Sequence, residues 1–318
     1  MARLHFFLHQ ATVLFLAVEC CLGFASQTST GRFLGIVQAS SNTFQDSQTK
    51  LTVILPAFNE SQRIGETLHL YHDYLVTEQS KTTKCDILVV NDGSTDETVQ
   101  VVEYFSSKSD TAVPVQCLSF THNQGKGAAI AAGVQHTSKG STNSNNNNQH
   151  LILIADADAS ADIACLPALS SKLEELLEAN NNNPSLNHAA MVVGKRTYNH
   201  ESRSASRMIL RWGFRTAVQV LCGDLGVSDT QCGFKLLTLP AAQQLYSNLQ
   251  LQGWSHDVEV LYRAKQVFHI PVTEEAVFWQ DKAGSKLVTS ASGTIGASLQ
   301  MLLEIAQLRL LYSVGIWK

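Results

Sequence analysis

Apolar runs of strand length alternate with helical patterns from Leu51 onward, and this alternation constrains the chain more than any other feature. The run LTVIL ends at Pro56 and precedes a segment with apolar residues at the spacing of one helix face, at positions 64, 68, 71 and 75. The segments CDILVVNDGSTDETVQVVEYF and VPVQCLSFTHNQGKGAAIAAGVQHT repeat the order strand, turn and helix, with strands expected over 87–90 and 115–120. Such alternation predicts an α/β fold with a mostly parallel sheet and helices on both faces.

A fourth strand is expected in LILIADADAS, residues 151–160, where an apolar run ends in two aspartates one residue apart. Ligands of open α/β sheets bind outside the carboxyl ends of the strands. Asp156 and Asp158 are hard oxygen ligands at that edge, which suits Mg²⁺ or Mn²⁺ holding a diphosphate. The alternative is that Asp158 caps a helix over 166–177 while Asp156 starts a turn.

The turns after the first three strands bring further polar groups to the same edge. PAFNE supplies Glu60, and NDGSTDE supplies Asp92 and Asp96. A ribose needs a carboxylate for its hydroxyl groups, so Glu60 and Asp92 are candidates to bind a nucleotide, whereas Asp96 is expected to cap a helix. NQGKG places two glycines around Lys126 and favours close approach of the backbone to a nucleotide, although the motif is too short for a phosphate-loop fingerprint.

Composition excludes several classes of protein. The formal net charge is -4 and the pI about 6.2, so no basic field indicates a nucleic-acid partner. The seven cysteines form no Cys-x-x-Cys pair, which argues against a structural zinc site and against a disulfide framework. The hydrophobic content of 44% is that of a globular protein with a sizeable core.

The N-terminal region differs from the remainder of the chain. Residues 1–25 are expected to form a signal peptide or a signal anchor, because an apolar stretch from Phe6 to Phe24 follows Arg3 and ends in small residues. Residues 26–50, rich in Ser, Thr and Gln, fit a linker, and residues 51–318 form the main domain. Two asparagine-rich runs, 143–148 and 180–183, are expected to be exposed insertions.

The motifs LTVILPAFNE, VVNDGSTDET, NQGKGAAIAAG and IADADAS, in this order, resemble the family-2 inverting glycosyltransferases with a GT-A fold. The segments MVVGKR, GVSDTQCGFKLLT, WSHDVEVLYRAK and FWQDKAGSKL are most similar to the dolichyl-phosphate β-glucosyltransferases within that family. Two positions depart from the pattern: Ala159 stands where glycine is usual after the Asp-Ala-Asp, and His256 replaces an aromatic residue.

The resemblance implies a Rossmann-like GT-A domain that transfers glucose from UDP-glucose to dolichyl phosphate with inversion. The product would be dolichyl β-D-glucosyl phosphate, which serves lipid-linked oligosaccharide assembly and protein N-glycosylation. The two aspartates would hold Mg²⁺ or Mn²⁺ against the diphosphate. Contacts to the nucleotide-sugar are implied for Pro56, Ala57, Glu60, Asp92, Lys126, Asp156 and Lys286.

The downstream motifs supply the candidate residues for the acceptor side of the reaction. Asp257 is the candidate base or sugar-orienting residue, with Asp229 and Glu259 as rivals. A dolichyl phosphate oxygen is already anionic near neutral pH, so the chemistry demands no strong base. Guanidinium groups match phosphate oxygens, which makes Arg196, Arg207 and Arg215 candidates to bind the lipid phosphate. Surface ion pairing is the alternative for Arg203 and Arg211.

The C-terminal segment 295–317 is apolar at helical spacing and carries few charges. We expect it either to cover the sheet or to lie in a membrane interface, where a lipid acceptor would arrive. UDP-glucose is made in the cytosol, so an uncleaved anchor would hold the domain on the cytosolic side of the endoplasmic reticulum membrane; cleavage would route it to another organelle. Rival functions are polyprenyl-phosphate mannosyl or other sugar transfer, a non-catalytic nucleotide-sugar-binding protein, and a sugar-nucleotide pyrophosphorylase.

Overall fold

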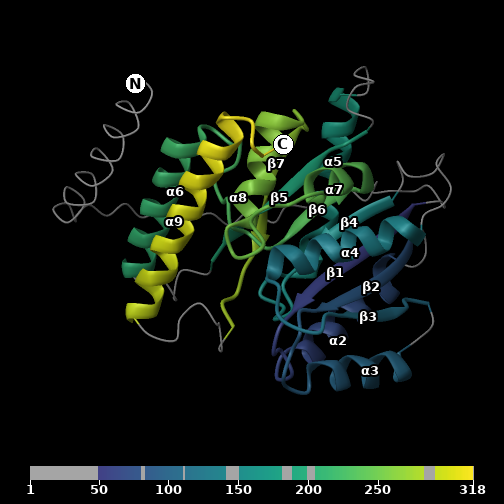
Figure 1. Ribbon diagram of the computed structural model, residues 1–318. Helices are drawn as coiled ribbons and strands as arrows, with labels where there is room; N and C mark the ends of the chain where they lie inside the picture. Colours follow the sequence, from purple (N-terminus) through teal and green to yellow (C-terminus); the bar gives the residue numbers. More distant parts are fainter. Residues whose placement is uncertain are drawn as a thin grey trace, which may run out of the picture.

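A seven-stranded sheet with strand order β3-β2-β1-β4-β6-β5-β7 forms the centre of the computed structural model (Figure 1). Four neighbouring strands run in parallel: β1 (Lys50–Ala57), β2 (Lys84–Asn91), β3 (Val115–Ser119) and β4 (His150–Ile154). The strand β6 (Lys235–Thr238) runs antiparallel between β4 and β5 (Met191–Thr197), and β7 (Val272–Phe278) pairs in parallel with β5. The predicted, mostly parallel sheet is confirmed.

The structure describes residues 49–79, 83–109, 112–140, 150–180, 188–198, 205–282 and 291–317, and leaves the side chains at 78, 79, 205–212, 291–295, 297 and 298 undescribed. The expected leader, nearly all of the expected linker and most of both asparagine-rich runs therefore lie outside the described residues.

The central strands are apolar on both faces because helices cover both sides of the sheet. In β1 the side chains of Val53, Ile54 and Leu55 have no exposed surface, and every residue of β4 is buried. Ala57 pairs with Asn91, so β1 and β2 end together, and β4 ends nearby at Ile154, opposite Ile54 of β1. Their carboxyl ends form one edge of the sheet, where the polar turns follow.

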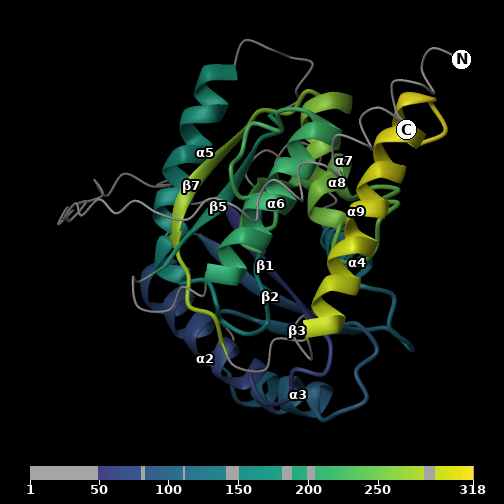
Figure 2. The ribbon, with the colours of Figure 1, turned by 90° about the vertical axis from the view of Figure 1, so that its left-hand side faces the viewer.

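Two sets of helices cover the sheet, as Figure 2 shows. On one side lie α2 (Ile64–Tyr74), α3 (Thr98–Lys108) and α5 (Leu166–Asn180), and on the other α4 (Lys126–Gly140), α7 (Leu239–Tyr246) and α8 (His256–Tyr262). The predicted apolar face of α2 is buried. The small residues of α4 let it lie close to the sheet: a Cβ on Gly133 would be 2.8 Å from Cγ2 of Ile54.

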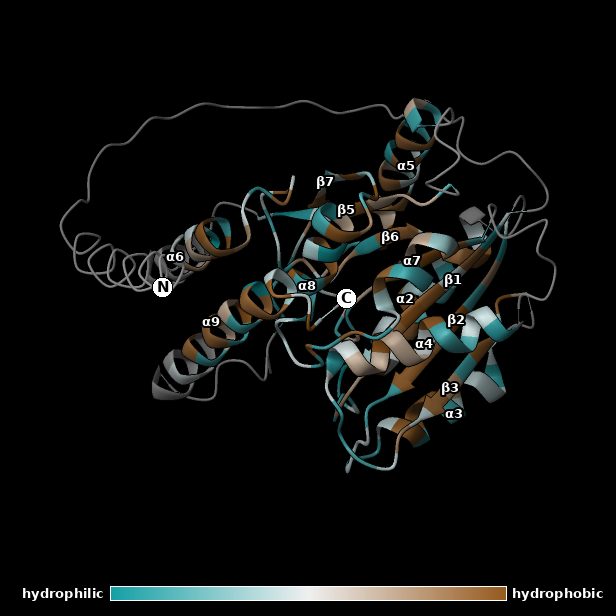
Figure 3. Cartoon of the chain, turned by 45° about the horizontal axis from the view of Figure 1, so that its top comes forward, coloured by the Kyte–Doolittle hydropathy of each residue, from teal (hydrophilic) through white to brown (hydrophobic). Residues whose placement is uncertain are grey.

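A pair of helices, α6 (Ala205–Cys222) and α9 (Ala291–Ser313), packs side by side beyond α8 (Figures 1 and 2). Hydrophobic residues recur along the coloured part of α9 in Figure 3. Ile305 and Leu308 are buried against the body, whereas Leu299 and Leu303 are 58% and 63% exposed. The expected C-terminal helix is thus present, and it is apolar on two opposite faces. Among the described residues, no helix combines the length and apolar character needed to span a membrane.

Candidate active site

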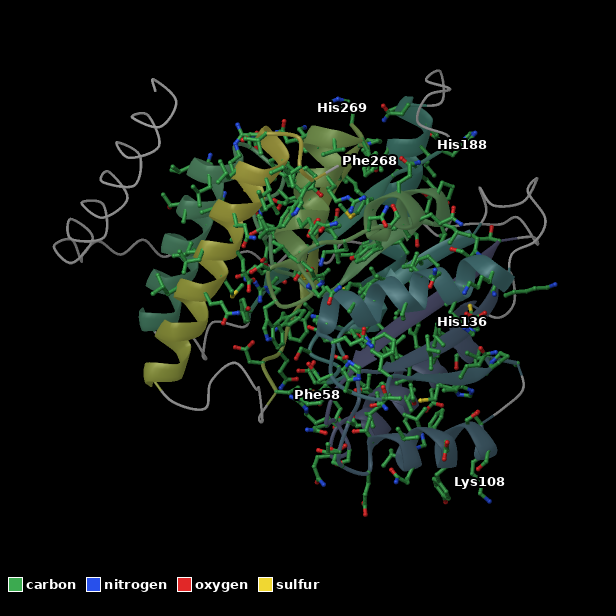
Figure 4. The ribbon with its side chains drawn as sticks, in the orientation of Figure 1. Phe58, Lys108, His136, His188, Phe268 and His269 are labelled. Carbon is green, nitrogen blue, oxygen red and sulfur yellow. The ribbon has the colours of Figure 1, made fainter. Side chains whose placement is uncertain are left out.

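The turns after β1 and β2 are joined by hydrogen bonds at the carboxyl edge of the sheet. Figure 4 shows Phe58 at this edge, with His136 and His188 at the far one. Asn59 has a left-handed backbone (φ 53°), its N–H donates to Ser94 Oγ at 2.9 Å, and its Oδ1 accepts from Thr95 N at 2.7 Å. Asp96 accepts from Thr98 N at 3.0 Å and from Ser61 N at 3.1 Å. Asp96 therefore stands one residue before Glu97, the N-cap of α3; it accepts from the first N–H of the helix, as a cap would, and also fixes the first turn.

Asp92 orders the NQGKG turn. Its carboxylate accepts hydrogen bonds from Gln124 N at 2.7 Å, Gly125 N at 2.9 Å and Asn123 Nδ2 at 2.9 Å. Burial raises the pKa of Asp92, and the two backbone N–H groups partly offset that rise. The backbone N–H of Asp92 itself donates to Ala57 O at 2.8 Å, so this residue ties three turns together.

Each aspartate of the Asp-Ala-Asp sequence faces a cation. Lys126 Nζ lies 2.5 Å from Asp156 Oδ1, and Arg63 Nη1 lies 3.3 Å from Asp158 Oδ2. Arg63 also pairs with Glu60, its Nη2 2.6 Å from Oε1 and its Nε 2.7 Å from Oε2. All five side chains are at most a quarter exposed. The site is therefore a row of alternating charges at the ends of β1 and β4.

The capping alternative for Asp158 is wrong. Asp158 Oδ1 accepts from Ser160 N at 3.0 Å, two residues along, and does not reach the helix. The cap comes from Asp162, whose Oδ1 accepts from Ala164 N at 2.9 Å ahead of α5. Ala159 between them has φ 52°, a left-handed conformation that glycine adopts at least cost, which explains why glycine is usual at this position.

Lys126 lies between the site and the start of α8. Its Nζ is 5.5 Å from the ring centre of Trp254, an indole that is 46% exposed. Burial opposes the positive charge of Lys126, but Asp156 and Asp257 more than offset it, so the pKa of Lys126 is raised. Lys126 therefore keeps its charge next to an exposed aromatic face.

Asp257 is buried beneath this cation. Its Oδ1 lies 2.5 Å from Lys235 Nζ and 3.1 Å from His256 Nε2, the second contact lacking hydrogen-bond alignment. Burial alone would raise the pKa of Asp257, but His256 and Lys235 hold it well below its usual range. Its role as a base stays a prediction; in the structure it is the ion-pair partner of buried Lys235.

The segment DTQCGFK makes one contact with the site and one with Arg196. Gly233 packs against Asp156, since a Cβ there would be 2.4 Å from Oδ2 of the carboxylate. Asp229 binds Arg196 in a fork, with Nε and Nη2 each 2.7 Å from one carboxylate oxygen. Arg196 lies over the Trp279 ring at 5.4 Å. The Arg196 hydrogen bonds and charge outweigh burial, so the pKa of Asp229 is lowered.

The donor set fits a divalent ion that arrives with a diphosphate. Mg²⁺ is usually held by one or two carboxylates together with substrate phosphates. Asp156 and Asp158 supply two such carboxylates, and the missing Cβ of Gly233 keeps space beside the first. Within the part of the chain that the structure describes, no group of three or more His, Cys, Asp or Glu side chains could hold a metal by itself. The phosphates would therefore complete the ligand shell.

The structure brings together most of the residues that the sequence indicated. Pro56, Ala57, Glu60, Asp92, Lys126, Asp156 and Asp158 gather at the carboxyl edge. Arg196 and Asp229 form their own pair, and Arg215 is exposed on α6. Lys286, Arg203 and the side chains of Arg207 and Arg211 lie outside what the structure describes.

Sequence reasoning missed Arg63, Lys235 and Trp254. Arg63 follows Glu60 by three residues, a spacing that favours an ion pair on a helical turn. Lys235 stands within the apolar run GFKLL, and a lysine there needs a buried acidic partner. Trp254 is the first residue of the motif WSHDVE that indicates Asp257, so its position is a usable signal.

Comparison with known proteins gives a consistent set of relatives. The profile of "Glycosyl transferase family 2" matches residues 52–233. A dolichyl-phosphate beta-glucosyltransferase from Homo sapiens is 35% identical, covering 86% of this chain and 79% of the relative. The enzyme of the same name from Dictyostelium discoideum is 33% identical over 84% of this chain and 76% of its own length.

Solved structures share the fold. Glucosyl-3-phosphoglycerate synthase from Mycobacterium tuberculosis in complex with UDP has a TM-score of 0.52 at 13% identity, covering 86% of each chain. The same synthase with Mn²⁺, UDP and phosphoglyceric acid has a TM-score of 0.51 at 14% identity, covering 85% of this chain and 80% of that one.

Replacing Gly125 by Ala should destabilise the site edge. Gly125 has φ 103°, and a Cβ would be 2.4 Å from Gln252 O, a backbone atom that cannot move alone. Strain and overpacking together should lower the free energy of unfolding by about 2 to 3 kcal/mol. Gly253→Ala is the matched control, because its Cβ meets nothing within 4 Å; its effect should stay within about 0.5 kcal/mol. Urea denaturation measures both, and equal losses would contradict the packing described.

Proposed function

The chain belongs to glycosyl transferase family 2, and from that premise we propose that it transfers glucose from UDP-glucose to dolichyl phosphate with inversion, forming dolichyl β-D-glucosyl phosphate. The observation that carries the proposal is the paired aspartates at the end of β4, each facing a cation, in a chain similar over most of its length to enzymes of that name. This product would serve lipid-linked oligosaccharide assembly.

On the donor side, Asp156 and Asp158 would hold the divalent ion. When bound, Mg²⁺ or Mn²⁺ supplies Lewis-acid stabilisation of the charge that develops on the UDP leaving group. Lys126 and Arg63 already stand beside the two carboxylates and would lie close to the diphosphate, where positive charge stabilises the same leaving group. Pro56, Ala57, Glu60 and Asp92 would contact uridine. Lys286 would contact the diphosphate.

On the acceptor side, an oxygen of the lipid phosphate would attack the anomeric carbon from the face opposite UDP. One C–O bond forms as the bond to UDP breaks, which inverts the configuration. Arg207 and Arg215 on α6 would attract the phosphate, and Asp229 would orient Arg196 toward it. Asp257 would act mainly by holding charge near Lys126 and the sugar.

The outer face of α9 would rest on the membrane that carries the acceptor. Leu299, Leu303 and Leu310 follow the i, i+4, i+11 spacing of one helix face, Val314 continues this line directly after the helix ends, and all four are exposed. The charged residues of α9 are Glu304 and Arg309, which stand to the sides of this stripe. An apolar stripe above a buried inner face suits a helix lying in the interface.

We place the protein at the endoplasmic reticulum membrane with the catalytic domain on the cytosolic side, where UDP-glucose is made. The support is the apolar N-terminal stretch, interpreted as an uncleaved anchor. N-terminal sequencing of the mature protein tests this placement, because cleavage near Ala25 would contradict it.

The donor assignment predicts the outcome of a direct assay. Membranes containing the protein, given dolichyl phosphate and Mn²⁺ with either labelled UDP-glucose or labelled GDP-mannose, should make lipid-linked sugar from UDP-glucose. Asp158→Asn should lower the rate at least about a hundredfold, because the leaving group loses a metal ligand. Asp162→Asn, which alters a helix cap, is the control and should retain the rate. Product from GDP-mannose alone would refute the glucosyl assignment.

Two variants separate the parts of the acceptor proposal. Leu299→Asp with Leu303→Asp should reduce transfer to dolichyl phosphate in vesicles about tenfold or more, since charge on this face opposes interfacial binding. The same variant should keep its rate on a short, water-soluble isoprenyl phosphate. Arg215→Ala should raise KM for both acceptors and leave KM for UDP-glucose unchanged. Equal losses on both acceptors for the leucine variant would rule out the interfacial role of α9.

A further inference from the structure

Glu259 of α8 is a buried carboxylate that accepts several hydrogen bonds from the backbone. It has no exposed surface, and its oxygens accept from Gln250 N, at 3.0 Å to each, and from Leu251 N at 2.6 Å. Arg263 Nη1 lies 4.0 Å away. Because both oxygens are committed to backbone N–H groups, Glu259 fixes the segment 250–254 rather than facing a substrate.

The segment 250–254 is in turn locked to the turn that carries Lys126. Gly127 N donates to Gln252 O at 2.8 Å, and Gly125 leaves no room for a Cβ against the same carbonyl. His256 Nδ1 donates to Gly253 O at 2.8 Å. The segment ends at Trp254, whose ring lies against Lys126. A displacement of this segment would therefore move Lys126 relative to Asp156.

One residue of α9 reaches this system. The Tyr312 hydroxyl donates to Glu259 Oε1 at 3.0 Å, while its ring packs on Tyr262 and Trp317. Next to this contact, α9 and the segment 250–253 are separated by a groove of about 240 Å³ lined by Gln250, Gln252, Glu304 and Trp317. Because this groove lies between α9 and the segment, the Tyr312–Glu259 hydrogen bond joins the two through α8.

We propose that Tyr312 is a positioning residue, whose hydrogen bond to Glu259 fixes the segment 250–254 and thereby the place of Lys126 and Trp254 at the diphosphate site. The consequence for the reaction rests on the proposed function, whereas the link itself does not. Because the outer face of α9 carries the exposed apolar stripe, the seating of α9 and the geometry of the donor site are connected through this bond.

Hydrogen exchange on the full-length protein tests the link without any enzyme assay. Tyr312→Phe removes the hydroxyl and keeps the ring contacts. The matched control is Tyr262→Phe, because the Tyr262 hydroxyl accepts from Arg309 Nη1 at 2.8 Å and so also joins α8 to α9, but without touching Glu259. We expect amide exchange in peptides covering 248–254 to quicken about tenfold in Tyr312→Phe and to stay within about twofold of wild type in Tyr262→Phe. Equal exchange in the two variants would overturn the proposal.

Steady-state kinetics test the effect on the donor site. Tyr312→Phe should lower kcat/KM for UDP-glucose about three- to tenfold, chiefly through KM, while Tyr262→Phe should stay within about twofold of wild type. A shared loss would mark general destabilisation and would contradict the positioning role. If the wild-type protein transfers no glucose, the proposed function fails, and the exchange comparison still decides the link.

Discussion

The two aspartates that follow β4 are negative charges at the edge of a buried sheet, and the remaining site is arranged to compensate them. Lys126 faces Asp156, and Arg63 bridges Asp158 and Glu60. Partly buried carboxylates without partners would be costly, so these cations keep the site folded before any ligand binds. The same pairing prepares the chemistry, because a metal diphosphate brings both the cation that the carboxylates can bind and the anion that Lys126 and Arg63 can bind.

A second layer keeps that arrangement in place. Asp92 orders the turn before Lys126 through three hydrogen bonds. The buried Asp257 carboxylate, paired with Lys235, lies near Lys126 and favours its positive charge. The close approach of Gly125 and Gly233 to neighbouring groups explains why glycine stands in NQGKG and in DTQCGFK. The Gly125 and Gly233 contacts reach Gln252 and Asp156, so they connect loops that are far apart in the sequence and account for the joint presence of these motifs in one chain.

The sequence predicted those parts of the structure that follow from local pattern. The apolar run 51–55, the helical spacing over 64–75 and the position of Asp156 and Asp158 after a second apolar run were sufficient for β1, α2 and the site edge. The pairing of charges was not predictable, because the bond between Arg63 and Asp158 spans 95 residues and depends on the order of the strands. The sequence alone also allows Asp158 to be the cap of the following helix. In the structure, Asp162 occupies that capping position. Glu259 is a residue type that can act as a base, which made it a candidate from the sequence. In the structure its carboxylate is buried and accepts hydrogen bonds from the backbone of Gln250 and Leu251.

The central claim is that the compensated carboxylates form a metal site completed by the diphosphate of the donor. Electron paramagnetic resonance of Mn²⁺ titrated into the purified protein, with and without UDP, measures this directly. The account predicts binding at least about tenfold tighter with UDP, because the phosphates complete the ligand shell and engage Lys126 and Arg63. Asp158→Asn should remove this gain. Equal Mn²⁺ affinity with and without UDP, or an unchanged gain in Asp158→Asn, would contradict it.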